Sequence, residues 1–315
     1  MRSAFALLLL FPAIASAQTK EMVEAIERKL DSDRTAKWVF SLQAPNGGFY
    51  LAPQDPNIDA APRPSLRATS GAVRALKYRG FPLLKGEREK HAAFVLSCYD
   101  PKTGAFAEPG GKPDVAITSV GVMAALELGI PKEKFAKAMD YLKENAKTFE
   151  EVRIGAAAVE AWGVKDCPFD RGHWLLISGN YAQTAFKGAL GPTAARAREA
   201  GSLLAFSLRL NPDRKLEPEQ IQTMSSPLLD GQRADGGWGK SDEKASDIET
   251  TYRVMRALML LKVKPKDVKK LREFVASHRN EDGGYATKPG DKSTMSGVYY
   301  ATIITKWLDE MEAKK

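Results

Sequence analysis

Two acidic side chains and two lysines lie close together in one part of this sequence, where they could carry out chemistry. Asp247 and Glu249 are two residues apart, and Lys240 and Lys244 occupy the loop just before them. Carboxylates can transfer protons when their surroundings adjust the pKa, and lysine ammonium groups can hold an anionic group. Asp247 and Glu249 are therefore candidate catalytic residues, and Lys240 and Lys244 are candidate ligand-binding residues.

Each of these candidates also has a simpler structural explanation. Asp247 precedes a run of helix-forming residues, as Asp114 and Asp291 do, and aspartate at such a position commonly caps the helix. The two lysines have Asp242 and Glu243 between them, which lowers the local positive potential. Helix capping and solvated loop lysines are therefore the alternatives to a catalytic and binding role.

Three aromatic side chains near these residues are candidates for the wall of a ligand-binding cavity: Trp238, Tyr252 and Tyr299. Packing in the hydrophobic core is at least as good an explanation for each of them. The choice between the two roles depends on the elements that position these side chains.

Those elements recur along the chain. Six times a polar residue precedes a run of small, apolar, helix-forming residues, with anchors at positions 65, 114, 151, 196, 247 and 291. The intervals run from 37 to 51 residues. A period of this size is typical of a helical repeat array.

Each repeat is predicted to contain an outer and an inner helix. Outer helices are predicted at residues 87–97, 132–145 and 267–277, where apolar residues recur at three- and four-residue spacing. The inner helices start at the six anchors and are small and apolar on almost all sides, as buried helices are. Glycine followed by an aromatic residue recurs in the loops at residues 45–49, 102–106, 234–238 and 281–285.

The first 17 residues have the pattern of a secretory signal peptide. Arg2 gives a short positive region, residues 4–14 are apolar, and Ala15-Ser16-Ala17 forms a small-residue cleavage site. A retained N-terminal anchor is the alternative. No later stretch has the apolar length of a membrane span. We therefore expect cleavage after Ala17 and a secreted or periplasmic protein.

The composition argues against some partners. The chain has 47 basic and 39 acidic residues, a net charge of +8, and no interleaving of basic and aromatic residues of the kind that binds nucleic acid. Two cysteines, Cys98 and Cys167, lie in different repeats, and the sequence leaves open whether they pair. A protein partner and the oligomeric state are also left open.

A resemblance to a known family comes from the loops. Residues 232–238, Gln-Arg-Ala-Asp-Gly-Gly-Trp, resemble the Gln/Trp repeat of squalene and oxidosqualene cyclases. The wider pattern of a glycine pair, an aromatic residue, an aspartate and an alanine-rich helix is similar to the β subunits of protein prenyltransferases. Residues 94–128 are especially similar to the geranylgeranyl transferase β subunit.

The resemblance implies an all-α fold, the α/α toroid, with about six inner and outer helix pairs around a central apolar cavity. It covers residues 35–307, weakly between 149 and 210. The expected organisation is a signal peptide at 1–17, a leading helix at 18–34 and the toroid at 35–315.

The same resemblance argues against a zinc site. Prenyltransferase β subunits hold zinc with an aspartate, a cysteine two residues later, and a histidine near the start of the last inner helix. The matching positions here are Asp247, Glu249 and Gly297, so one of three ligands is kept. A site without cysteine and histidine holds zinc poorly. We expect no zinc and no zinc-dependent protein prenylation, while a role for magnesium stays open.

The family also suggests how a ligand would bind. Its members hold the isoprenoid diphosphate with basic residues in the loop before the aspartate, where this chain has Lys240 and Lys244. Class II terpene cyclases protonate an alkene with the middle aspartate of Asp-x-Asp-Asp. The segment here reads Asp247-Ile-Glu-Thr250, and a lone Glu249 is a weaker proton donor unless its surroundings are strongly tuned. Cyclisation by that route is therefore not expected.

The sequence thus predicts a secreted, prenyltransferase-like toroid that handles an isoprenoid or another amphiphilic small molecule in its central cavity. Whether it catalyses a reaction is left open. A non-catalytic binding or interaction scaffold is one alternative. A carbohydrate-active toroid enzyme is another, and it would need a surface groove with a carboxylate pair, or a tyrosine or histidine base near arginine or asparagine. Fold alone does not choose among these functions.

Overall fold

The computed structural model describes residues 17–54, 63–187 and 191–313, with the side chains of residues 17–24 left aside. Within these ranges the chain is helical apart from turns, loops and isolated β-bridges. The predicted all-α toroid is confirmed by this architecture. The predicted signal peptide, apart from Ala17, lies outside the described residues.

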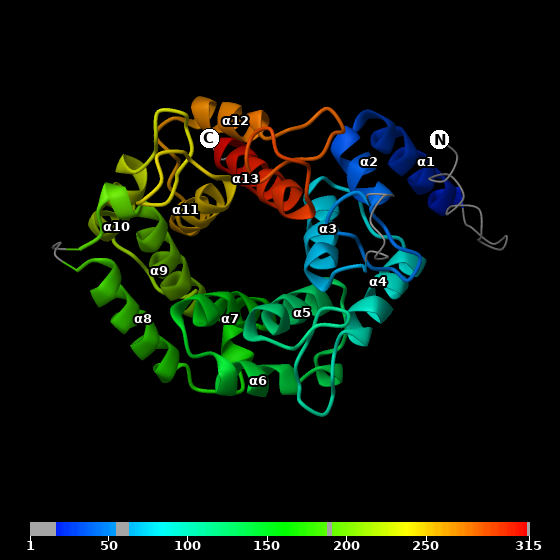
Figure 1. Cartoon of the computed structure of the whole chain (residues 1–315), viewed down its shortest axis with the longest axis horizontal. Coiled ribbons are helices and arrows are strands. Elements are labelled where there is room, and N and C mark those ends of the chain that lie inside the picture. The colour runs from blue at the N-terminus through cyan, green and yellow to red at the C-terminus, as the bar shows by residue number, and fades with distance from the viewer. Residues whose placement is uncertain (1–16, 55–62, 188–190, 314–315) are drawn as a thin grey trace.

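Six inner helices form a closed ring (Figure 1). Each packs against the next along the chain, and the last packs against the first, so the ring has no free end. The inner helices are α3 (Leu66–Tyr78), α5 (Val115–Glu127), α7 (Phe149–Trp162), α9 (Ala197–Leu210), α11 (Ile248–Leu261) and α13 (Met295–Ala313).

One outer helix precedes each inner helix, which gives the six predicted pairs. These outer helices are α2 (Arg34–Ser41), α4 (Lys85–Ser97), α6 (Lys137–Asn145), α8 (Gly172–Ala185), α10 (Pro218–Asp230) and α12 (Val268–Ser277). The outer helix predicted at 132–145 is split, because a 3₁₀ turn over Lys132–Lys134 comes before α6. Helix α1 (Ala17–Ser32) occupies the predicted leading segment and lies outside the ring beside α2 (Figure 1).

Polar caps start three inner helices at the predicted anchors. The side chains of Ser65, Asp114 and Asp247 each accept a hydrogen bond from the backbone N–H three residues later. Such a bond satisfies a backbone donor that the helix itself leaves unpaired. The capping role expected for Asp114 and Asp247 is therefore confirmed.

Two other anchors are corrected. Helix α7 is capped by Thr148, which forms a reciprocal capping box with Glu151, so the helix starts three residues earlier than position 151 indicates. Helix α13 begins at Met295, and the hydroxyl of Thr294 accepts from the N–H of Gly297 at 3.1 Å. Asp291 lies four residues before that helix and does not cap it.

The glycine-aromatic loops are fastened to the inner helices by a repeated hydrogen bond. The backbone N–H groups of Phe49, Phe106 and Trp238 donate to the hydroxyls of Thr69, Thr118 and Thr251, each four residues after its helix cap. In the 234–238 loop, Gly236 has a φ of +91°, and a Cβ there would lie 2.2 Å from the carbonyl carbon of Lys270. Only glycine fits this close approach.

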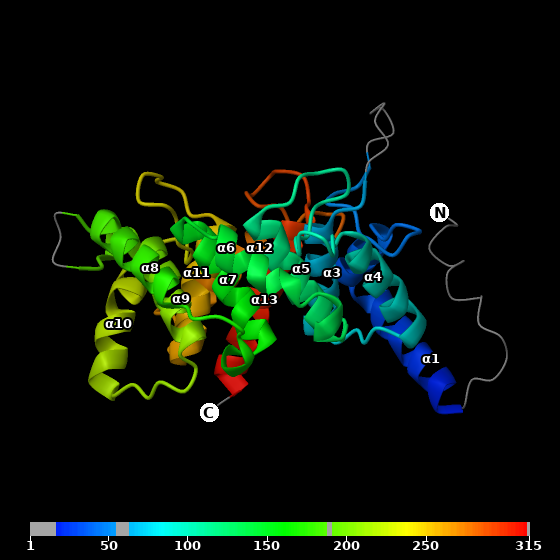
Figure 2. The same cartoon turned by 90° about the horizontal axis from the view of Figure 1, so that it is seen from below.

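The hydrophobic core lies between the inner and outer helices. Trp238 is fully buried there, and its indole N–H donates to the carbonyl of Leu228 at 2.7 Å. Cys98 and Cys167 form no disulfide. Over the described ranges, no helix is both long and apolar enough to cross a membrane. The loops that precede α5, α11 and α13 gather on one side of the ring (Figure 2), which places the starts of these inner helices together.

Candidate functional site

A cavity of about 510 Å³ lies inside the ring, and all six inner helices contribute to its lining. Helices α3, α7, α11 and α13 each contribute lining residues that are three, four or seven positions apart. Residues at this spacing lie on one face of a helix. On α11 this face carries Glu249, Tyr252, Arg253 and Arg256. Five of the inner helices therefore each contribute a stripe of residues to the cavity, and α9 contributes Arg209.

The polar part of the lining is larger than the sequence suggested. It includes six arginines and four glutamates, namely Arg67, Arg74, Arg153, Arg209, Arg253, Arg256, Glu150, Glu151, Glu160 and Glu249. The expectation of an apolar cavity is corrected by these side chains. The inner helices are small and apolar where they pack against each other and against the outer helices, but their cavity stripes are charged.

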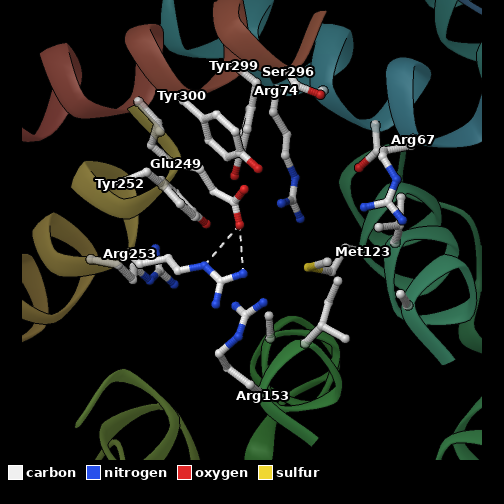
Figure 3. A pocket seen from close by; sticks show the side chains of 18 of the residues that line it. Arg67, Arg74, Met123, Arg153, Glu249, Tyr252, Arg253, Ser296, Tyr299 and Tyr300 are labelled. Atoms are coloured by element: carbon white, nitrogen blue, oxygen red, sulfur yellow. Dashed lines mark hydrogen bonds and ion pairs between the residues drawn. The ribbon is translucent and has the colours of Figure 1, made fainter. Parts of the chain in front are cut away.

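One wall of the cavity remains aliphatic. Ala116, Val120 and Met123 lie on one face of α5, and Ile154 and Ala157 of α7 continue that surface. Figure 3 shows Met123 across the open space from the tyrosines of α11 and α13. The cavity therefore offers both an apolar wall and a charged one, which suits a ligand with two kinds of surface.

Near the starts of the inner helices, four charged side chains form what we call the first-turn network: Glu150, Arg153, Glu249 and Arg253. Arg253 donates to Glu249 at 2.7 Å and to Glu150 at 2.8 Å, which links α11 to α7 (Figure 3 shows the Glu249 contacts). Arg153 donates to the other oxygen of Glu150 at 2.8 Å. Both carboxylates are therefore paired with arginines.

The first-turn network should make stability depend on pH. Burial alone would raise the pKa of Glu150, but the charges of Arg153 and Arg253 lower it to about 2. A carboxylate whose pKa is lowered by folding stabilises the protein above its ordinary pKa, and the stabilisation is lost as the pH falls towards the folded-state value. The Glu150 side chain is 49% exposed, so we expect solvent screening to limit the effect to about 1 kcal/mol.

The Glu150→Gln variant tests this. At neutral pH it should unfold more easily than the wild type, and the difference should shrink as the pH is lowered from about 5 to about 2, as measured by urea unfolding. Glu144→Gln, at an exposed position on α6, is the control. A difference that stays constant over this pH range would contradict the assignment.

Further along the inner helices lie three arginines that we call the arginine cluster: Arg74, Arg209 and Arg256. Glu160 is the carboxylate that meets two of them. It accepts from Arg256 at 2.5 Å, and Arg209 Nε lies 3.1 Å from the same oxygen without the alignment of a hydrogen bond. Arg74 extends into the open space and has no ion pair with a described carboxylate (Figure 3).

Two tyrosines sit beside the arginine cluster. Burial alone would raise the pKa of Tyr252, but the charges of Arg209 and Arg256, together with a hydrogen bond from Tyr299, lower it. Burial and the neighbouring Tyr252 raise the pKa of Tyr299. The Tyr252 ring stacks on Trp307, with centroids 5.6 Å apart. The hydroxyl of Tyr252, which lines the cavity, is therefore more acidic than an ordinary tyrosine hydroxyl.

The residues predicted from the sequence divide into two groups. Glu249, Tyr252 and Tyr299 line the cavity together. Trp238 is buried in the core, and Asp247 caps α11, so neither is among the lining residues.

Lys240 and Lys244 also lie outside the cavity. Lys240 is exposed in the loop before α11 and pairs with Glu243 at 2.7 Å, and Lys244 is exposed in the same loop. Their role in ligand binding stays a prediction.

The positions that match zinc ligands in prenyltransferases do not fit zinc here. Asp247 uses one oxygen to cap α11, Glu249 is paired with Arg253, and Gly297 has no side chain. Among the described residues, no group of three or more histidine, cysteine, aspartate or glutamate side chains is arranged to hold a metal ion.

The arginine cluster was missed by sequence analysis, although a signal was present. Arginines and glutamates interrupt the apolar inner helices at helical spacing: Arg67 and Arg74 are seven apart on α3, and Arg253 and Arg256 three apart on α11. Polar residues that share one face of an otherwise buried helix indicate a polar cavity. This charged face was overlooked in the sequence because small apolar residues surround these arginines.

Comparison with known proteins agrees with the fold. The family model of the prenyltransferase alpha-alpha toroid domain matches residues 3–163 and 202–315, so the chain belongs to this family. The resemblance to the prenyltransferase and squalene cyclase family, identified from the loop sequences, is confirmed by this match. No curated protein sequence matches the chain.

Several solved structures share the architecture. Type II terpene cyclase MstE from Scytonema has a TM-score of 0.57 and 10% identity, over 91% of this chain and 99% of that chain. A variant of that enzyme in complex with its substrate, geranylgeranyl dihydroxybenzoate, has a TM-score of 0.55 and 10% identity, over 93% and 99%. A protein from Actinoplanes has a TM-score of 0.55 and 11% identity, over 92% and 99%. At these identities the likeness shows the fold.

Proposed function

We propose that the central cavity binds an amphiphilic small molecule, an isoprenoid or a compound of similar shape. The observation that supports this most directly is the two-sided lining. The aliphatic wall of α5 and α7 can hold an apolar chain, while the tyrosines and arginines on the opposite side can hold a polar end. A terpene cyclase of the same fold binds a geranylgeranyl compound, which supports the ligand class.

We assign binding rather than carbocation cyclisation to this cavity. Its lining has six arginines against four glutamates, and excess positive charge disfavours a cationic intermediate. Glu249, the candidate proton donor, is paired as a carboxylate with Arg253 at 2.7 Å. A protein that binds and carries the ligand, or one that transforms its polar end, fits these side chains better.

Filling the aliphatic wall should weaken binding. Ala116 on α5 lines the cavity, so the ring introduced by Ala116→Phe would occupy the space of the apolar chain. We expect the affinity for geranylgeraniol, measured by isothermal titration calorimetry, to fall roughly tenfold or more, since overpacking of this kind commonly costs 1–3 kcal/mol.

Ala276→Phe is the matched control, because Ala276 is exposed on the outer helix α12. It should leave the affinity unchanged. If neither geranylgeraniol nor an acidic analogue binds the wild type, the small-molecule function is wrong and an interaction scaffold is favoured. Equal affinity of both variants and the wild type would place the ligand outside this cavity.

A carbohydrate-active enzyme is a second candidate, since one observation favours it. Tyr252 has a lowered pKa next to Arg209 and Arg256, the kind of tyrosine–arginine constellation that such an enzyme requires. The site is a cavity of about 510 Å³ inside the ring of inner helices, which suits a small acidic sugar better than a polymer. Including oligouronates among the titrated ligands distinguishes the two candidates, because only the carbohydrate candidate predicts that they bind more tightly than geranylgeranoic acid.

A further inference from the structure

We propose that the arginine cluster of Arg74, Arg209 and Arg256 is a binding site for an oxyanion, the carboxylate, sulfate or phosphate head group of an amphiphilic ligand. This rests on the proposed function for the apolar part of the ligand. The family resemblance would place a head group near Lys240 and Lys244. The cluster instead places it inside the ring, near the later turns of the inner helices.

The charge around the cluster is incompletely balanced. Glu160 is the carboxylate that pairs with two of the three arginines, at 2.5 Å and 3.1 Å. Arg74 has no ion pair with any described carboxylate, so three positive charges face one negative charge. Burying unbalanced charge is unfavourable, and a bound anion would remove that cost.

Unused hydrogen-bond donors point to the same conclusion. The Nε atoms of Arg74, Arg209 and Arg256 are all buried, and none has a hydrogen-bond partner within the described part of the chain. Arg209 is only 7% exposed. Buried polar groups are normally hydrogen-bonded, but Arg74 Nε and Arg256 Nε have no partner, and Arg209 Nε lies 3.1 Å from Glu160 without the alignment of a hydrogen bond, so these guanidinium groups are incompletely hydrogen-bonded. An oxyanion has several acceptor oxygens and suits guanidinium groups well.

The tyrosine pair completes the polar end of the chamber. Tyr252 and Tyr299 both line the cavity, and each hydroxyl acts on the pKa of the other. Arg74, Arg209 and Arg256 all lie close enough to Tyr252 for their charges to act on its pKa. Arg74, Arg209, Arg256 and Tyr252 all line the cavity, so they are the candidate donors to one anionic group.

The aliphatic wall sets the direction of the ligand. With its head group at the arginine cluster, the chain of the ligand would run along Val120 and Met123 towards the first-turn network. In that network both glutamates are already paired with arginines. The arginine cluster, where the charges remain unbalanced, is therefore the stronger site for an anion.

A pair of ligands that differ in their head group tests the proposal. Geranylgeranoic acid and geranylgeraniol have the same chain, so their affinities for the wild type measure the contribution of the anion. We expect the acid to bind about 10- to 100-fold more tightly, the range expected for a hydrogen bond to a charged group. Arg74→Met should remove most of this preference, because it weakens binding of the acid more than binding of the alcohol.

Stability separates binding from a structural role. Because Arg74 has no carboxylate partner, Arg74→Met should unfold at a temperature no lower than the wild type, whereas loss of a structural ion pair would lower it. Arg67→Met is the matched control, since Arg67 lines the same cavity on the first turn of α3. It should keep the preference for the acid.

Inorganic pyrophosphate tests the anion site without the apolar chain. It should raise the melting temperature of the wild type more than that of Arg74→Met. If pyrophosphate behaves so but neither isoprenoid binds, the anion site stands and the proposed function falls. Equal affinities for acid and alcohol, or a loss of preference in Arg67→Met but not in Arg74→Met, would overturn the anion site.

Discussion

Replacing Trp238 by alanine is expected to lower the free energy of unfolding by about 3–5 kcal/mol, the usual cost of removing a buried tryptophan. The side chain is fully buried between α11 and the neighbouring helices, and its indole N–H donates to Leu228 at 2.7 Å. Removal would leave a large void and an unpaired carbonyl. Urea unfolding followed by circular dichroism measures the change.

The Trp238→Phe variant separates the two contributions. It keeps most of the aromatic volume and loses the hydrogen bond, so about 1–2 kcal/mol of the loss should remain. Tyr300→Phe, which removes a hydroxyl from the cavity, is the control and should leave stability nearly unchanged. If Trp238→Ala instead kept its stability and lost affinity for the ligand, the indole would belong to the binding site.

Replacing Glu160 by glutamine is expected to destabilise the protein by about 1–2 kcal/mol, below the range for breaking a fully buried ion pair, because its side chain is 33% exposed and solvent screens the charges. This carboxylate lies against both Arg209 and Arg256, and it is the one that balances the arginine cluster. Without it, none of the three guanidinium groups would be paired with a described carboxylate. Chemical unfolding of the variant and the wild type gives the difference.

An added anion should reverse part of this loss. Pyrophosphate is expected to raise the melting temperature of Glu160→Gln more than that of the wild type, because an anion would then meet three unpaired arginines. Asp230→Asn is the control: Asp230 pairs with Lys266, both are about half exposed, and the cost should stay below about 1 kcal/mol. A Glu160→Gln variant as stable as Asp230→Asn would show that the cluster is solvated rather than buried.

Local signals made much of the fold predictable. The caps at Ser65, Asp114 and Asp247 and the glycine-rich loops depend on residues within a few positions of each other. Capping and positive φ are decided by the local chain, so they can be identified in the sequence. The predicted starts of α7 and α13 were wrong, because Thr148 and Thr294 accept the first hydrogen bonds there instead of the predicted anchors at 151 and 291.

The candidate site was only partly predictable. Glu249, Tyr252 and Tyr299 were identified, and they lie together in the cavity. Lys240 and Asp247 are close to Glu249 in the sequence, yet they point elsewhere, because one is in an exposed loop and the other holds the helix start. Proximity in sequence does not fix which face of a helix a neighbour occupies.

By itself, the sequence determined the repeat and the helix pairs, because these follow from periodic patterns and turn residues that act over short distances, and its resemblance to the prenyltransferase and squalene cyclase family implied the toroid. Only the tertiary structure decided the character of the cavity. Glu160 and Arg256 are 96 residues apart, and Glu150 and Arg253 are 103 residues apart, yet ring closure brings each pair into contact. Several charged side chains of the site form ion pairs with residues on other helices. Which charges find a partner therefore depends on which inner helices face each other.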